Sequence, residues 1–70
     1  MKNRVQELRW KKGWSQLQLA RISGVAQSTI CAIENQECVP NLCTAYKLAQ
    51  ALSVNIYFLF ELKIRRQENL

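Results

Sequence analysis

Apolar residues recur at helical spacing along most of this chain, but residues that end helices divide the pattern into short pieces. Gly13 and Gly24 are typical of the left-handed position that closes a helix. Pro40 disfavours helical geometry at the residue before it. No helix can therefore be long, and we expect several short helices in place of one continuous one.

Five helical segments are indicated, and three have a clear starting residue. Ser15 follows Gly13 and is a good N-cap, because its hydroxyl accepts from an amide two or three residues on. Asn41 and Asn55 can cap two later segments. The positions expected to be buried are Val5 and Leu8, Leu17 and Ala20 with Leu19 and Ile22 as further candidates, Ile30 and Ile33, then Leu42, Ala45, Leu48, Ala49 and Leu52, and finally Ile56, Leu59 and Phe60.

The residues after Phe60 leave two structures open. Phe60, Leu62 and Ile64 alternate with charged residues, and a period of two favours a short β-strand. A helix that continues and frays fits equally well. We therefore expect one domain over residues 1–62, followed by a basic tail over residues 63–70.

The aromatic residues outside the expected core raise a question of partners. Trp10 and Trp14 flank Gly13 and are expected to pack on the core. The run of apolar residues before Glu61 exceeds what one short helix can bury, so Tyr57 or Phe58 should be exposed. An exposed aromatic surface suggests a partner, and a homodimer contact near the C-terminal region is our hypothesis.

Length and charge limit the classes of function. Seventy residues leave room for one small domain and no large cleft. Ten Lys and Arg against five acidic residues give a net charge of +5, which favours a polyanionic partner such as nucleic acid or a membrane surface. The longest apolar run is five residues, whereas a membrane span needs about 20.

The sequence gives little support for a catalytic site or a metal site. The absence of His excludes a Ser-His triad and a His-based metal site. Cys31, Cys38 and Cys43 do not have a zinc-site spacing, and an odd number of thiols with no secretory segment indicates a cytoplasmic protein. The glutamates do not pair on one helical face. We expect no enzyme activity, no metal, no cofactor and no small-molecule effector.

The most specific motif begins at Gln16. Counting from it, Ala20 is fifth, Gly24 ninth, Ile30 fifteenth and Ile33 eighteenth. A helix-turn-helix that reads DNA needs a small residue at the fifth position, glycine in the turn, and two apolar residues that anchor its second helix. The other face of that helix is then free to enter a DNA groove.

With its flanking segments, this motif resembles the phage Cro/repressor (XRE-type) helix-turn-helix family. The resemblance implies an all-α, compact five-helix domain of the lambda-repressor type, with the motif at residues 16–35, that binds double-stranded DNA as a homodimer. The segments that carry it are K-N-R-V-Q-E-L-R, K-K-G-W-S-Q-L-Q-L-A, G-V-A-Q-S-T-I-C-A-I-E-N, P-N-L-C-T-A-Y-K-L-A-Q-A-L-S-V and I-Y-F-L-F.

The resemblance also assigns roles to individual residues. Gln16 matches a glutamine that clamps phosphate at a helix N-terminus. Gln27 and Ser28 match the first exposed positions of the recognition helix, where glutamine suits adenine and serine can bond to several bases. Cys31 and Ala32 match positions that could touch a thymine methyl, and Thr29 and Asn35 match positions that often bind phosphate. Arg9 and Glu34 match a partly buried ion pair of the family.

Two departures from the family bear on affinity. The family usually has Gly where Gln36 stands, and the loop that follows often carries basic residues, which are missing here. Phosphate binding must then depend on Lys11, Lys12, helix N-termini and neutral donors. We expect modest affinity with a shallower salt dependence than a strongly basic repressor shows.

These observations predict a sequence-specific DNA-binding transcriptional regulator. A repressor is favoured over an activator, because the first helix of the motif carries Gln18 and Arg21 and no acidic patch. The first alternative is an antitoxin-like or other protein-interaction module with secondary DNA binding. A membrane-surface peptide ranks third, since it would need one long amphipathic helix.

Overall fold

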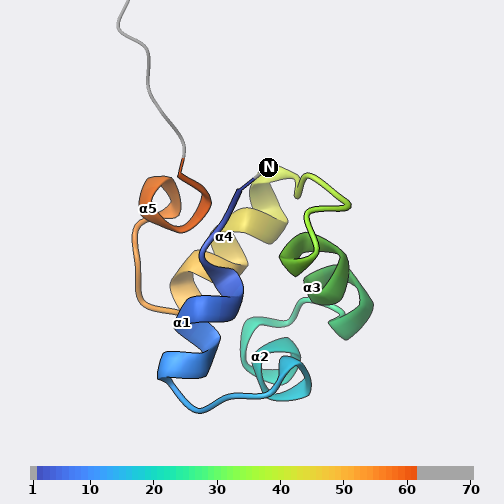
Figure 1. Cartoon of the computed structure of the whole chain (residues 1–70), viewed down its shortest axis with the longest axis vertical. Coiled ribbons are helices and arrows are strands. Elements are labelled where there is room, and N and C mark those ends of the chain that lie inside the picture. The colour runs from blue at the N-terminus through green and yellow to red at the C-terminus, as the bar shows by residue number, and fades with distance from the viewer. Residues whose placement is uncertain (1, 62–70) are drawn as a thin grey trace, which may run out of the picture.

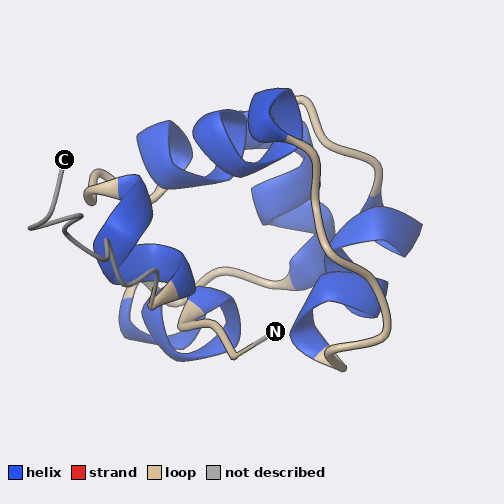
Figure 2. Ribbon diagram, turned by 90° about the horizontal axis from the view of Figure 1, so that it is seen from above, coloured by secondary structure: helices blue, strands red, loops and turns tan. Residues whose placement is uncertain are grey.

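The computed structural model describes residues 2–61, and they form five short helices around one core (Figure 1). No strand occurs in this part of the chain, so the predicted all-α five-helix fold is confirmed (Figure 2). The strand considered after Phe60 and the basic tail over residues 63–70 lie outside the described residues. The helices are α1 (Val5–Lys11), α2 (Gln16–Ser23), α3 (Gln27–Glu34), α4 (Leu42–Ala51) and α5 (Ile56–Phe60).

Helix α4 holds the bundle together. It packs against both α2 and α5, while α3 packs against both α2 and α1. Every helix contributes at least one residue to a single continuous core. The core residues are Val5, Leu19, Val25, Ile30, Ile33, Ala45, Leu48, Ala49, Leu52, Leu59 and Phe60.

The predicted helix ends are confirmed. Ser15 Oγ accepts from the Gln18 amide at 3.1 Å, and Gln18 Oε1 accepts from the Ser15 amide at 2.7 Å, which together form a capping box. Gly13 and Gly24 have φ of +72° and +79°, where a residue with a Cβ would be strained. The turn that separates α2 from α3 therefore depends on glycine.

The later helices start at the predicted asparagines. Asn41 Oδ1 accepts from the Thr44 amide at 2.8 Å, and Asn55 Oδ1 accepts from the Tyr57 amide at 2.7 Å. Helix α3 differs, because its N-cap is Ala26 and no side chain caps it. The N-terminal amides of α3 are therefore left to solvent or to a ligand.

Several residues expected to be buried are exposed. On α2 the residue that faces the core is Leu19, so Leu17, about 160° away around the helix, is exposed, and Ile22 is exposed as well. Leu42 is 79% exposed, because it is the first residue of α4 and the buried positions of that helix begin about one turn later, at Ala45. Trp10 is 62% exposed, and only Trp14 packs on the core.

Helix α5 has the predicted division of faces. Leu59 and Phe60 are buried and Ile56 packs against the core, whereas both Tyr57 and Phe58 are about half exposed. No helix among the described residues has both the length and the apolar content that a membrane span requires.

Candidate nucleic-acid interface

One face of α3 points away from the core and carries all four predicted base-reading residues, together with the predicted phosphate contact Asn35. Ile30 and Ile33 anchor the opposite face, with exposures of 0% and 1%. At 3.6 residues per turn, the outer residues span an arc of about 140°. They are Gln27, Ser28 and Asn35, all exposed, and Cys31 and Ala32, both half-buried.

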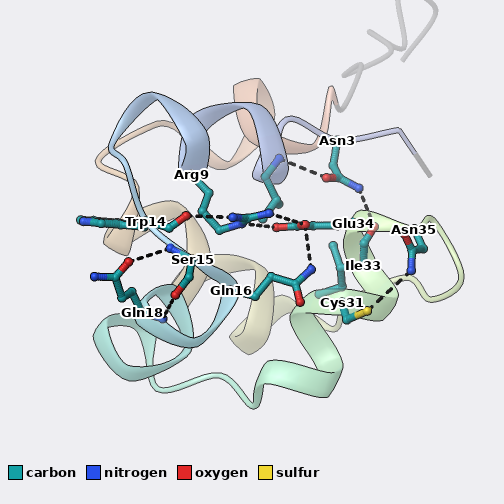
Figure 3. Close-up of polar contacts among 11 residues, drawn as sticks. Asn3, Arg9, Trp14, Ser15, Gln16, Gln18, Cys31, Ile33, Glu34 and Asn35 are labelled. Atoms are coloured by element: carbon teal, nitrogen blue, oxygen red, sulfur yellow. Dashed lines mark hydrogen bonds and ion pairs between the residues drawn. The ribbon is translucent and has the colours of Figure 1, made fainter.

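The structure leaves Thr29 out of this face. Helical geometry places it about 60° beyond Ala32, toward Ile33, and it is half-buried. Within the outer face, Asn35 Nδ2 donates to Cys31 Sγ at 3.6 Å, one turn away (Figure 3). The five outer residues thus form one surface without a charged side chain, and its polar and small apolar groups suit contacts to base edges and to phosphate.

Gln16 lies at the start of α2, beside the end of α3. It is the first helical residue after the Ser15 cap and is half-buried. Its Nε2 donates to Glu34 Oε1 at 3.0 Å (Figure 3). Sequence reasoning missed this contact, because nothing in the spacing of the two residues shows that their side chains meet.

The predicted ion pair of Arg9 and Glu34 is present and buried. Arg9 Nε donates to Glu34 Oε2 at 2.8 Å and Nη2 to Oε1 at 3.0 Å, with side-chain exposures of 8% and 1%. Arg9 Nη1 also donates to the Trp14 carbonyl at 2.8 Å. The pair therefore ties α1, the loop before α2 and the end of α3 together.

This environment favours the charged form of Arg9. The hydrogen bond to Glu34 is the main cause that raises the pKa of the Arg9 guanidinium; burial lowers it, and the carboxylate charge raises it further. A two-point contact of this kind is strong when no water competes for the same atoms. Removing either partner would leave a buried charge unpaired, which is costly.

The two predicted phosphate-binding lysines have different surroundings. Lys11 Nζ lies 3.8 Å from Glu7 Oε2, one turn back on α1, and both side chains are mostly exposed. Lys12 Nζ lies 5.3 Å from the centroid of the Trp14 ring, in the segment that leads to α2. Of the two lysines, Lys12 is therefore the better placed to contact a phosphate near the start of α2.

Gln36 occupies a position that favours glycine. Its φ is +61°, and its amide donates to the Ile33 carbonyl at 3.0 Å while the Glu37 amide donates to the Ala32 carbonyl at 2.8 Å. These two bonds form a Schellman motif, in which the left-handed residue is usually glycine. Gln36, which stands where the resemblance leads us to expect Gly, is therefore a strained residue.

The cysteines do not form a site in the part of the chain that the structure describes. All three are free thiols; Cys31 and Cys38 are half-buried and Cys43 is exposed. Over residues 2–61, no three His, Cys, Asp or Glu side chains are grouped so that they could hold a metal ion.

Comparisons with known proteins agree with this geometry. A family model described as helix-turn-helix matches residues 5–59. The chain is 41% identical over 63 residues to the uncharacterized HTH-type transcriptional regulator YgzD of Bacillus subtilis, covering 90% of this chain and 96% of that protein. It is 38% identical over 60 residues to an uncharacterized HTH-type transcriptional regulator of Archaeoglobus fulgidus, covering 86% of each.

A solved structure shows the same arrangement of helices. The chain is similar to the restriction-modification controller protein C.AhdI from Aeromonas hydrophila, with a TM-score of 0.76 and 38% sequence identity. The match covers 81% of this chain and 86% of that one. The likeness therefore extends over most of the five-helix bundle.

Proposed function

This chain belongs to the helix-turn-helix family of DNA-binding transcriptional regulators, and we propose that it reads a specific DNA sequence with α3 in the major groove. The observation that carries the proposal is the outer face of α3. Ile30 and Ile33 fix the helix to the core, while Gln27 and Ser28 stand exposed at its start. Polar side chains at the N-terminal end of such a helix are the ones that reach base edges.

The proposed contacts divide into two kinds. Gln27 pairs with the N6 and N7 atoms of an adenine, Ser28 bonds to a neighbouring base, and Cys31 and Ala32 touch a thymine methyl. Phosphate contacts hold the protein in register without reading sequence. They come from Gln16, Thr29, Asn35, Lys11 and Lys12, and from the uncapped start of α3.

The regulator acts as a homodimer in this proposal. Tyr57 and Phe58 form an exposed aromatic surface on α5, and two copies joined through it would have two-fold symmetry. The two α3 helices would then enter major grooves about 34 Å apart on a two-fold operator. Bound over a promoter in the cytoplasm, the dimer would exclude polymerase and act as a repressor.

Selection from a pool of random duplex DNA, followed by sequencing, tests this function. We expect an enriched palindrome that contains adenines at the positions read by Gln27. Repeating the binding at two salt concentrations should give a shallow salt dependence, because few basic side chains lie near the motif. Weak binding without enrichment at either salt concentration would contradict sequence-specific regulation.

A further inference from the structure

The Glu34 carboxylate, at the end of α3, accepts hydrogen bonds from two other helices (Figure 3). Oε2 accepts from Arg9 Nε, and Oε1 accepts from both Arg9 Nη2 and Gln16 Nε2. The side chain is only 1% exposed, so water cannot replace these donors. Arg9 already neutralises the carboxylate through two hydrogen bonds. The bond from Gln16 is therefore not needed for charge balance.

This arrangement fixes the direction of the Gln16 amide. A carboxylate only accepts hydrogen bonds, so the amide nitrogen of Gln16, and not its oxygen, must face Glu34. The amide carries two N–H groups in one plane. When the first points at Glu34 Oε1, the direction of the second is set. Because Gln16 is only half-buried, part of its side chain remains accessible to a ligand.

Charge also matters at this position. A DNA phosphate that contacts Gln16 would approach the Glu34 carboxylate, and two negative charges repel each other. The guanidinium of Arg9 removes this repulsion, since the hydrogen-bonded pair has no net charge. The start of α2 adds backbone N–H groups, which favour an anion.

We propose that Glu34 is a positioning residue for DNA binding, which holds the Gln16 amide so that its second N–H donates to a backbone phosphate. The proposal rests on the function proposed above, in which Gln16 contacts phosphate. An unanchored glutamine would lose its side-chain freedom only when DNA binds, at a cost to affinity. Because Glu34 also ends α3, it holds the phosphate contact in fixed relation to the base-reading face.

A double-mutant cycle tests the positioning role. Glu34→Ala alone would leave Arg9 unpaired and could unfold the protein, so the ion pair is replaced as a unit by Arg9→Met with Glu34→Leu. Gln16→Ala is then made in the native and the apolar background. Affinity for a random-sequence duplex is measured by fluorescence anisotropy, with Gln50→Ala on the exposed side of α4 as the matched glutamine control.

Gln16→Ala should weaken binding about tenfold in the native background, the size of one hydrogen bond to a charged group. In the apolar background, where Gln16 has lost its anchor, the same change should cost less than about twofold. Equal losses in the two backgrounds, or no loss in the native one, would overturn the positioning role. Failure of the unmodified protein to bind any duplex would instead overturn the proposed function.

Side-chain NMR relaxation on the native protein supplies a second test that does not depend on the apolar background folding. The Gln16 amide should be as rigid as the backbone of α2 before DNA is added, whereas the exposed Gln50 amide should be mobile. A Gln16 side chain as mobile as that of Gln50 would contradict the proposal.

Discussion

Arg4 Cζ lies 4.5 Å from the centroid of the Phe58 ring, so a stacked guanidinium joins the segment before α1 to α5. Arg4 Nε donates to the Phe58 carbonyl at 3.1 Å, and Nη1 lies 3.5 Å from Glu61 Oε2. The ion pair is about one-third exposed and contributes little by itself. Stacking and the bond to the carbonyl are the larger contributions.

Arg4→Ala should therefore lower the free energy of unfolding by about 1 kcal/mol, because a cation–π contact is worth about 0.5–1 kcal/mol. Urea denaturation measures the change. Arg4→Lys is the matched control, since it keeps the charge but loses the planar fork, and it should recover only part of the loss. Full recovery with lysine would mean that charge alone accounts for the effect.

Gln36→Gly should stabilise the protein. The residue has φ of +61° in a Schellman motif, where a Cβ is strained and glycine is not. We expect a gain of about 0.5–1 kcal/mol, or a rise in melting temperature of roughly 2–8 °C for a domain of this size. Gln36→Ala keeps the Cβ and should give no gain. A lower melting temperature for the glycine variant would show that the Gln36 side chain makes a compensating contact.

Gln27→Ala should cost about 1–3 kcal/mol of affinity on the selected operator and leave binding to random duplex almost unchanged. The reason is that a contact to a base edge contributes only where the matching base is present. Titrations on both duplexes measure the difference. Gln6→Ala, at an exposed position of α1, is the control and should affect neither. An equal loss on both duplexes would reassign Gln27 to phosphate.

Ala20→Leu should destabilise the protein by about 1–3 kcal/mol, because the added atoms must fit where α2 already packs against its neighbours. Thermal unfolding followed by circular dichroism measures this. Arg21→Leu adds an apolar side chain at the next, exposed position and should change stability little. An unchanged melting temperature for Ala20→Leu would mean that the larger side chain fits at this position without displacing its neighbours.

Tyr57→Ser or Phe58→Ser should weaken self-association. Exposed aromatic residues are the side chains that most often dominate an interface, and each change should raise the dimer dissociation constant by about tenfold or more. Sedimentation equilibrium measures that constant. Trp10→Ser removes an aromatic residue that is more exposed than either of these but lies on α1, and it should have no effect. If only the Trp10 variant dissociates, the dimer forms through α1.

Helix boundaries could be predicted because they depend on neighbouring residues. Ser15, Asn41 and Asn55 accept from amides two or three residues ahead, and Gly24 needs no distant contact to adopt its positive φ. The spacing of the motif likewise predicted that Ile30 and Ile33 anchor its second helix, and both are buried. The base-reading and phosphate-binding assignments remain predictions.

Burial on short helices was harder to predict. A helix of two turns presents only one or two residues to the core, and which ones depends on where its neighbours lie. On α2, Leu19 is buried where the pattern predicted Leu17. The hydrogen bond between Gln16 and Glu34 was missed for the same reason, since it joins the start of one helix to the end of another.

The segment before α1 has a consequence for how the chain reaches its native state. Asn3 Nδ2 donates to the Ile33 carbonyl at 2.8 Å, and the Arg4 amide donates to the Leu59 carbonyl at 2.7 Å. Figure 1 shows this segment, in dark blue, between α3 and α5. During synthesis these residues are made before their partners, which lie about 30 and 55 positions later in the chain. The bond between Arg4 and Leu59 can therefore form only after the chain has been made through α5.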